Sequence, residues 1–306
     1  MDFSALVRLT TFYERISMKR RTLTRVIPAF AAAVALSAIA VHAIFPPLHV
    51  TVHVFNIGQG DAILIQDGYS EMLIDGGPDD TVLAKLGDAM PFFDRTIETV
   101  VLTHPHADHF IGLIGVLRRY KVKNVIFDGR VREKDPDYRR FKEAIASSGA
   151  QVTQIKVGDR ITLGDRTTFT ALWPPSDEAE STDIDAHDEN AWSVVFRMQA
   201  EGGSAYLMGD ATAEVEHRLL AAHLLSSADF LKVGHHGSRY SSSPEFLDAI
   251  HPKYAVISVG KNTYGHPSWL ALQRLATRGV RVWRTDQSGD VRATFKNGTV
   301  VMRAKK

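Results

Sequence analysis

The stretch His104-Pro105-His106-Ala107-Asp108-His109 decides the fold, because it crowds three imidazoles and one carboxylate into a single short turn. Imidazole nitrogens and carboxylate oxygens are the ligands that divalent ions such as Zn²⁺ prefer in proteins. Packing alone gives no reason to gather so many ionisable side chains there, since desolvating them without a partner is costly. The stretch therefore predicts a metal site.

The flanking sequence places this cluster on a strand-to-helix connection. Residues 99–103 are β-branched and apolar, which is typical of a buried strand. Residues 110–117 are apolar with two glycines and predict the start of a helix. Connections of this kind carry the chemistry of α/β folds, because the strand fixes the backbone beneath the loop.

Three further strand ends carry the same kinds of side chain. Asp75 follows the apolar residues 73–74, Asp210 follows 205–209, and His235-His236 follow 230–233. With the His-x-His-x-Asp-His pattern, this order resembles the metallo-β-lactamase superfamily over about residues 50–285. The resemblance implies an α/β fold: an αββα sandwich of two mixed sheets with outer helices, here with an N-terminal hydrophobic helix added.

The resemblance also implies a ligand set for two divalent ions. His104 and His106 would hold one ion, Asp108 and His109 the second; Asp210 would bridge the two ions, and His235 would complete the second site, with its neighbour His236 as the alternative. Zn²⁺ is the first expectation and Mn²⁺ the second.

The first site departs from the superfamily in one respect. Another histidine normally completes that site, and Asn190 stands in its place. His187 is the nearby substitute. A weaker amide donor favours Mn²⁺ and leaves a one-metal enzyme open.

Catalytic and substrate contacts are also carried over from the resemblance. Asp108, Asp75 and His266 are predicted catalytic residues, with Asp75 orienting a ligand or the attacking water and His266 donating a proton or binding phosphate. Ser238, Asn190 and Tyr264 are predicted to contact the substrate. Simpler interpretations stay open: Asp75 as a turn former, His266 as a loop residue bonded to backbone, and Ser238 with the serines at 241–243 as part of a helix cap.

A narrower resemblance is to the hydrolase-like domain of DNA-uptake proteins of the ComEC type. Five stretches carry it, in order: residues 54–62, 190–195, 235–238, 264–267 and 284–289. His106 is a departure, since that group often has Asp there, and a channel role is not carried over. The resemblance predicts a metal-dependent phosphodiesterase or nuclease acting on DNA or nucleotides by metal-activated water.

Two alternatives remain open from the sequence. One is a hydrolase of a lactam, lactone or thioester. The other is a membrane-tethered binding module with weak or no catalysis. No protein partner is predicted.

Bulk properties exclude some chemistry. The 306 residues contain no cysteine, so disulfides and thiolate metal sites are excluded. The net charge is +1, but the first 45 residues hold six Lys/Arg against two Asp/Glu, which leaves the remainder slightly acidic. Bulk charge thus gives no support for nucleic-acid binding.

The N-terminal sequence predicts export. A basic patch from Met18 to Arg25 precedes an apolar run from Val26 to Phe45, the layout of a signal peptide or a single membrane anchor. We therefore expect residues 18–45 to be that segment and residues 46–306 to be the hydrolase domain. Residues 1–17 would be an over-extended start or a cytoplasmic tail. The domain is expected outside the cytoplasm, periplasmic, extracellular or anchored in the cell membrane.

Overall fold

The computed structural model describes residues 49–176 and 188–305, with six scattered residues between 27 and 37. The chain divides into two compact units, Met1–Pro46 and Pro47–Lys306. Some sequence predictions fall wholly or almost wholly outside the described residues. They concern residues 1–17, the segment 18–45 with its hydrophobic helix, and His187. In the part of the chain that is described, no helix is both long and apolar enough to cross a membrane.

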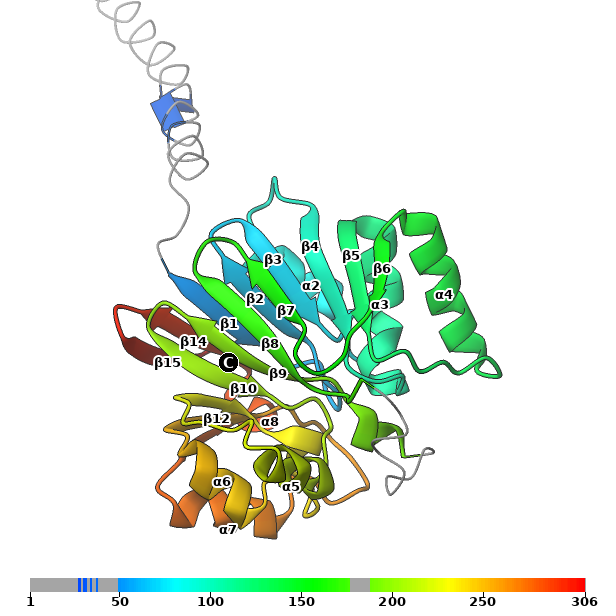
Figure 1. Ribbon diagram of the computed structural model, residues 1–306. Coiled ribbons are helices and arrows are strands. Elements are labelled where there is room, and N and C mark those ends of the chain that lie inside the picture. The colour runs from blue at the N-terminus through cyan, green and yellow to red at the C-terminus, as the bar shows by residue number, and fades with distance from the viewer. Residues whose placement is uncertain are drawn as a thin grey trace, which may run out of the picture. The chain divides into compact units, whose positions relative to one another are not determined.

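The strands of the described residues form two sheets (Figure 1). The first sheet has eight strands in the order β15-β14-β1-β2-β3-β4-β5-β6. They are β1 (Val50–Val54), β2 (Ile63–Asp67), β3 (Ser70–Ile74), β4 (Thr96–Leu102), β5 (Lys121–Phe127), β6 (Gln151–Gln154), β14 (Asp290–Lys296) and β15 (Thr299–Lys305). Antiparallel pairing from β15 to β3 gives way to parallel pairing from β3 to β6, so the sheet is mixed.

The second sheet has seven strands in the order β13-β12-β11-β10-β9-β8-β7. They are β7 (Arg160–Leu163), β8 (Thr167–Trp173), β9 (Val195–Ala200), β10 (Gly203–Leu207), β11 (Phe230–Lys232), β12 (Tyr254–Ile257) and β13 (Arg281–Arg284). This sheet is also mixed, because β10 to β13 are parallel and β7 to β10 are antiparallel.

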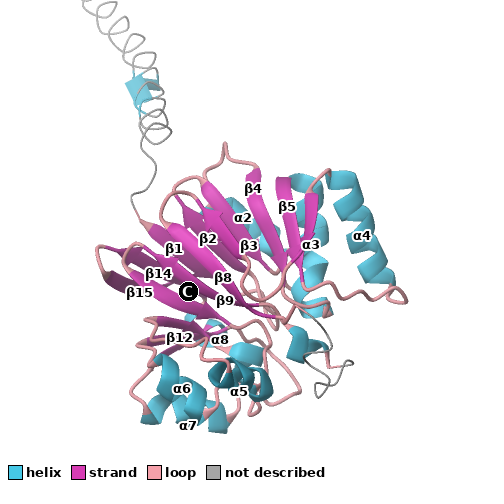
Figure 2. Cartoon of the chain, in the orientation of Figure 1, coloured by secondary structure: helices cyan, strands magenta, loops and turns pink. Residues whose placement is uncertain are grey.

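Helices cover the outer faces of both sheets (Figures 1 and 2). Residues of α2 (Thr81–Ala89), α3 (Ala107–Arg119) and α4 (Pro136–Ser148) share one apolar cluster with the first sheet. Residues of α5 (Ala213–Ala221), α6 (Pro244–Ile250) and α7 (Trp269–Thr277) share another with the second sheet. A third cluster joins the two sheets. These layers confirm the predicted pair of mixed sheets with flanking helices, and match the metallo-β-lactamase fold.

Alternation along the strands explains the layering. On β1, Val50, Val52 and Val54 belong to the cluster between the sheets. On β2, Ile63 and Ile65 face the same cluster, whereas Leu64 between them packs against the helices. Successive side chains of a strand point to opposite faces, so a strand buried on both faces becomes apolar throughout.

The helix after the histidine cluster begins earlier than the sequence predicts. We expected it to start at Phe110, but α3 begins at Ala107, with His106 at its N-cap. Asp108 and His109 therefore lie in the first helical turn and not on a loop. The negative charge of Asp108 suits that position, because the N-terminal end of a helix carries a partial positive charge.

Two glycines allow the close packing that fixes this turn. A side chain at Gly60 would clash with the backbone carbonyl of Asp108, and one at Gly112 would clash with that of Gly76. The amide of Asp61 donates to the Asp108 carbonyl at 3.3 Å, and the amide of Gly76 donates to that of His109 at 2.7 Å. The loops after β1 and β3 thus hold the first turn of α3 directly.

Candidate metal centre

Five strand ends deliver the candidate residues to one place. Asp75 follows β3 and the His104–His109 stretch follows β4; Asp210, the pair His235–His236 and the stretch 258–266 follow β10, β11 and β12 of the other sheet. The centre is therefore shared between the two sheets.

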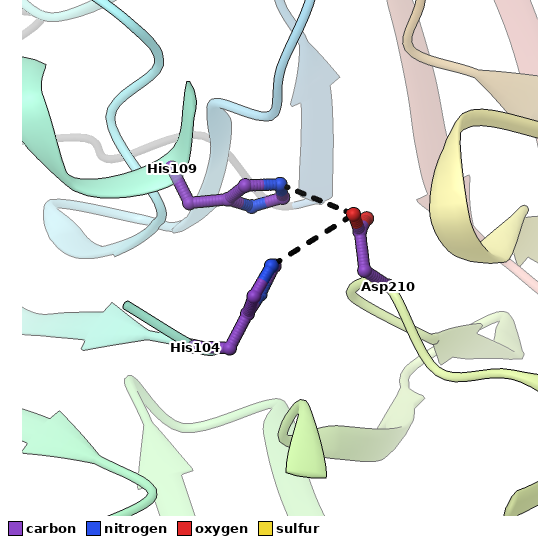
Figure 3. A group of neighbouring side chains, drawn as sticks. All are labelled: His104, His109 and Asp210. Atoms are coloured by element: carbon purple, nitrogen blue, oxygen red, sulfur yellow. Dashed lines mark ion pairs between the residues drawn. The ribbon is translucent and has the colours of Figure 1, made fainter. Parts of the chain in front are cut away.

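The carboxylate of Asp210 faces the rings of His104 and His109 (Figure 3). Its Oδ2 atom is 3.8 Å from Nε2 of His104, 3.5 Å from Nε2 of His109 and 3.5 Å from Nε2 of His236. One oxygen facing three ring nitrogens suits the bridging role predicted for Asp210.

Asp108 joins the same group from the first turn of α3. Its Oδ2 atom is 3.4 Å from Nε2 of His236 and 3.9 Å from Nε2 of His109. A tetrahedral ion with bonds of about 2.0–2.1 Å would separate its ligand atoms by about 3.3–3.4 Å. The spacing of Asp108, His109, His236 and Asp210 is close to that expectation, so these four residues would hold one divalent ion.

Unpartnered polar atoms at the centre also fit a cation. Nε2 of His109, Nε2 of His236 and Oδ1 of Asp210 are buried and make no hydrogen bond within the described residues. Buried polar atoms normally have partners, because leaving one unmatched costs about 1–3 kcal/mol. A metal ion would satisfy several of them at once.

His104 and His106 form the other half of the centre. Nε2 of His104 lies 3.0 Å from Nδ1 of His106, so both atoms face the same point. Nε2 of His106 lies 2.9 Å from Glu189, which in turn is bound by Arg132 at 2.7–2.8 Å. A carboxylate on one ring nitrogen of a histidine fixes the tautomer and leaves the other nitrogen for a metal.

Asp75 binds the ligand histidines from behind. It is fully buried and accepts hydrogen bonds from Nδ1 of His109, from the Thr103 hydroxyl and from the Thr103 amide, each at 2.8 Å. Because the Thr103 hydroxyl donates to Asp75, its oxygen accepts from Nδ1 of His104 at 3.0 Å. Asp75 therefore fixes Nε2 of His109 directly, and that of His104 through Thr103, toward the centre. This geometry supports the orienting role predicted for it.

Two other contacts orient the centre from the second sheet. Ser193 accepts from the amide of Asp210 and lies 3.0 Å from Nδ1 of His104. Nδ1 of His236 donates to the carbonyl of Ser258 at 3.0 Å. Nε2 of His236 is thereby left for a ligand.

Charges at the centre shift pKa values in opposite directions. Burial lowers the pKa of His109, but Asp210, Asp75 and Asp108 outweigh it and raise that pKa well above its ordinary value. The pKa of His236 is also lowered by burial, but nearby carboxylates, mainly Asp210, outweigh this and raise it. Burial, then the charge of His109, lower the pKa of His104.

The two central carboxylates show the opposite shift. Burial raises the pKa values of Asp108 and Asp210, but the charges of neighbouring histidines outweigh it and lower both values. The largest of these charges is His109 for Asp108 and His236 for Asp210. The centre therefore stabilises positive charge, which a divalent cation would supply.

The geometry favours His236 over His235 as the ligand at the second site. The resemblance seen in the sequence predicts His235 as this ligand, with His236 as the alternative. His236 belongs to a group with Asp108 and His109 whose ligand atoms lie within 4.8 Å of one another. His235 and His236 both adopt positive φ, 46° and 51°, so they lie in a tight turn and not on an extended chain. The ring of His235 instead packs against His266, with centroids 5.3 Å apart.

Asn190 lies beside the first half of the centre. It sits in the short 3₁₀ helix η2 (Glu189–Trp192), between Glu189, which contacts His106, and Ser193, which contacts His104. Its Oδ1 atom is buried and has no hydrogen-bond partner within the described residues. The placement suits both roles considered for it, a metal ligand and a substrate contact.

The remaining predicted residues lie around the His235 side of the centre. Ser238 is buried and accepts from the amide of Tyr240, while Ser243 caps α6 by accepting from Phe246.

The environment of His266 affects its protonation. Burial, followed by the charges of His235 and His236, lowers the pKa of His266 to about 4. Of the two roles predicted for His266, a neutral imidazole suits phosphate binding better than proton donation. Tyr264 is 74% exposed. The substrate contacts of Ser238, Asn190 and Tyr264 stay predictions.

A fully buried ion pair behind the centre was missed. Lys232 donates to Asp61 at 2.7 Å and to the Val233 carbonyl at 3.0 Å, and both charged side chains have no exposure. Oδ1 of Asp61 also lies 3.7 Å from Nδ1 of His236. A lysine inside the apolar run 230–233 was the available signal, since an unpaired buried charge is rare. Glu189 and Arg132 were also missed, and nothing in their local sequence marks them.

Comparison with known proteins agrees with this geometry. The family model described as "Metallo-beta-lactamase superfamily" matches residues 56–261. The chain belongs to this superfamily. Its similar curated proteins include ComE operon protein 3 of Bacillus subtilis (strain 168), 32% identical over 80% of this chain and 33% of that protein. Competence protein ComA of Neisseria gonorrhoeae is 30% identical over 83% of this chain and 34% of that protein. These relatives are ComEC-type competence proteins, as the sequence predicted, and the chain spans about a third of their length.

Solved structures support the fold. The metallo-beta-lactamase fold protein YhfI from Bacillus subtilis matches with a TM-score of 0.54 at 15% identity, over 83% of this chain and all of that one. Zn²⁺-bound PqqB from Methylobacterium extorquens matches with a TM-score of 0.51 at 14% identity, over 78% of this chain and 98% of that one. The diiron β-hydroxylase CmlA from Streptomyces venezuelae matches with a TM-score of 0.52, at 14% identity over 82% of this chain and 54% of that one. Because these titles name different metals, the fold does not by itself choose the ion.

Proposed function

We propose that this superfamily member is a metal-dependent phosphodiesterase that cleaves DNA or nucleotides. The observation that carries the proposal is the convergence of Nε2 of His109, Nε2 of His236 and the Asp210 carboxylate on one point. Both nitrogens are buried and have no hydrogen-bond partner within the described residues. The competence-protein relatives point to DNA as the phosphodiester.

The chemistry follows from the residues that would hold the ions. Divalent ions, with Zn²⁺ first and Mn²⁺ second, would make hydroxide available near neutral pH and polarise a phosphoryl oxygen. His104, His106 and Asp210 would hold one, with Asn190 as a further oxygen donor. Asp108, His109, His236 and Asp210 would hold the other. Asp75 and Glu189 keep the ring nitrogens of these histidines correctly oriented.

Groups at the edge of the centre would bind the phosphate. His266 is close to His235, and its Nδ1 atom is buried without a hydrogen-bond partner within the described residues. A neutral imidazole there donates from one nitrogen to a phosphoryl oxygen, which orients the substrate without a proton transfer. Asp75 contributes by orienting the ligand histidines, and Asp108 contributes as a ligand of the ion.

We further propose that the domain acts outside the cytoplasm. The basic and apolar residues 18–45 carry this proposal, as a signal peptide or single anchor. Cell fractionation with an antibody to the domain tests it: recovery in the periplasm, medium or membrane fraction supports export, and recovery in the cytoplasm contradicts it.

The deciding experiment combines metal content with cleavage. The purified chain is loaded with Zn²⁺ or Mn²⁺, its metal is measured, and cleavage of single-stranded and double-stranded oligonucleotides is followed. We expect bound metal and metal-dependent cleavage that Asp210→Ala abolishes. Asp248→Ala is the matched control, because Asp248 is an exposed carboxylate on α6 paired with Arg278.

Other outcomes point to the competing functions. Bound metal with no cleavage of any phosphodiester, but hydrolysis of a chromogenic lactam, lactone or thioester, would favour the carboxyl-derivative hydrolase. Failure to bind either metal would favour a binding module without catalysis.

A further inference from the structure

An exposed tyrosine lies at the end of a row of rings that starts at the centre. Ring centroids are 5.4 Å apart for His109 and His236, 6.4 Å for His236 and His235, and 5.3 Å for His235 and His266. Tyr264 then stacks on His266, with centroids 5.9 Å apart and planes inclined by 27°. Tyr264 is thus three ring contacts from His236, a candidate metal ligand.

The loop that carries Tyr264 is held rigidly. The side chain of Asn262 accepts from the amides of Tyr264 and His266 at 3.1 Å each. The same side chain donates to the carbonyls of Gly260 and His266 at 2.9 Å each. Four hydrogen bonds from one amide side chain fix the turn, so Tyr264 loses little further freedom when a ligand packs on it.

One face of the Tyr264 ring is therefore available. His266 stacks on the other face, and 74% of the residue is exposed. An aromatic ring offers a surface on which a nucleobase stacks irrespective of its sequence. Packing gives the ring no role in the core, because both apolar clusters of the second sheet lack it.

Two more exposed rings lie on the neighbouring connections. Tyr240 is 61% exposed with the Arg239 guanidinium 4.8 Å from its ring centre, and Trp269 is 71% exposed at the start of α7. The amide of Ser268, which precedes Trp269, donates to the Gly237 carbonyl at 2.8 Å and so ties the two connections together. A strand of several nucleotides would find a cation and more than one ring here.

We propose that Tyr264, supported by His266, is a stacking platform for an unpaired nucleobase next to the scissile phosphodiester. The inference rests on the proposed phosphodiesterase function and names its substrate class: single-stranded DNA or a frayed end. A base inside a duplex is already stacked on its neighbours and is not available to the ring.

The test compares a base-bearing with an abasic strand. The substrates are a twelve-residue oligothymidylate and an abasic strand of the same length, cleaved by the metal-loaded full chain. We expect Tyr264→Leu to raise KM for the oligothymidylate about five- to a hundredfold, the cost of one lost base–aromatic stack, with kcat little changed. KM for the abasic strand should stay the same, and Tyr264→Trp should retain the wild-type values.

Phe92→Leu is the matched control. Phe92 is 69% exposed, but it lies before β4, at the end of that strand opposite the histidine cluster. It should change neither KM. An equal effect of Tyr264→Leu on both strands, or no effect on either, would overturn the platform.

Binding separates this inference from the proposed function. If the wild-type chain cleaves neither strand, the phosphodiesterase proposal fails, and binding of fluorescent phosphorothioate versions of both strands is measured by anisotropy. The platform would still be supported if Tyr264→Leu bound the base-bearing strand more weakly than the wild type does, but bound the abasic strand equally well. Equal binding by the variant and the wild type would overturn it.

Discussion

Nδ1 of His109 donates a 2.8 Å hydrogen bond to Oδ2 of Asp75, in a place where neither side chain has any exposure. The contact crosses from the end of β3 to the first turn of α3, which follows β4. It decides which nitrogen of His109 faces Asp210. A metal-binding histidine needs such a partner, because only a nitrogen without a proton can coordinate an ion.

Replacing Asp75 by Asn should therefore weaken metal binding without unfolding the chain. The amide oxygen of the new side chain would keep the bond from the Thr103 backbone, and its NH₂ group would then face Nδ1 of His109. The imidazole would move its proton to Nε2 and lose its lone pair at the centre. We expect metal affinity to fall about 10- to 100-fold, measured by titration calorimetry.

Asp79→Asn is the control for this prediction. Asp79 lies in the same connection, is exposed, and accepts only a backbone bond from Thr81 at 2.8 Å. Its replacement should leave affinity unchanged. Wild-type affinity in Asp75→Asn would show that the hydrogen bond does not set the tautomer.

The neighbours His235 and His236 give a second prediction. His236→Ala should remove the ion held with Asp108 and His109, because Nε2 of His236 lies 3.4 Å from Asp108 and 3.5 Å from Asp210. His235→Ala should leave metal content unchanged, since its ring packs on His266. Metal content by mass spectrometry of the native protein checks both. Loss of metal from His235→Ala with retention in His236→Ala would restore the first sequence-based assignment.

That assignment illustrates what the sequence could and could not supply. Residue types at the strand ends carried a family resemblance, and that resemblance implied two mixed sheets, flanking helices and a shared centre. Such motifs can be read from the sequence because ligand chemistry and apolar periodicity are local properties. The choice between His235 and His236 was not local. It depends on positive φ at both residues, which nothing in the sequence His235-His236-Gly237 specifies, and on a partner carbonyl at Ser258 from another strand.

The residues that contact the candidate ligands from outside were harder still to predict. Glu189 reaches His106, and Arg132 reaches Glu189, across 83 and 57 positions in the numbering of the chain. Charged residues at such separations meet only because the two sheets pack together. Lys232 was detectable in principle, as a charge within an apolar strand, but its partner Asp61 lies in the connection between β1 and β2 of the other sheet.

Metal affinity should rise with pH. Asp210 and its neighbouring carboxylates raise the pKa values of His109 and His236, so protons compete with metal up to higher pH than at an ordinary histidine. Each displaced proton makes affinity change by up to about tenfold per pH unit below the pKa of its group. Calorimetry in two buffers of different ionisation enthalpy counts the protons released. Affinity that is independent of pH would contradict the prediction.

The buried pair of Lys232 and Asp61 should contribute strongly to stability. Lys232→Met leaves the Asp61 carboxylate buried without its partner, which costs about 3–5 kcal/mol of unfolding free energy in comparable cases. Lys253→Met is the control. Lys253 pairs with Asp229 at 2.8 Å, close to the 2.7 Å between Lys232 and Asp61, but the Lys253 side chain is 70% exposed. It should unfold at nearly the wild-type urea concentration. Equal midpoints for both variants would show that burial of the Lys232 pair adds nothing.

Glu71 should make the chain less stable as pH rises. Burial first, then the charges of Asp94 and Glu98, raise the pKa of Glu71 to about 8, against 4.5 for an ordinary glutamate. Between those values the folded chain holds a proton that the unfolded chain has lost, so the free energy of unfolding falls with rising pH, by at most about 1.4 kcal/mol per pH unit.

Glu71→Gln tests that prediction by removing the titration while keeping the bond from Gln66 to Oε1. The variant should match the wild type in urea unfolding near pH 5 and exceed it increasingly toward pH 8. Glu143→Gln, at an exposed position of α4, should follow the wild-type curve at every pH. A constant difference between Glu71→Gln and the wild type across this range would mean that Glu71 does not change its protonation on unfolding there, and that its burial is compensated in the charged form.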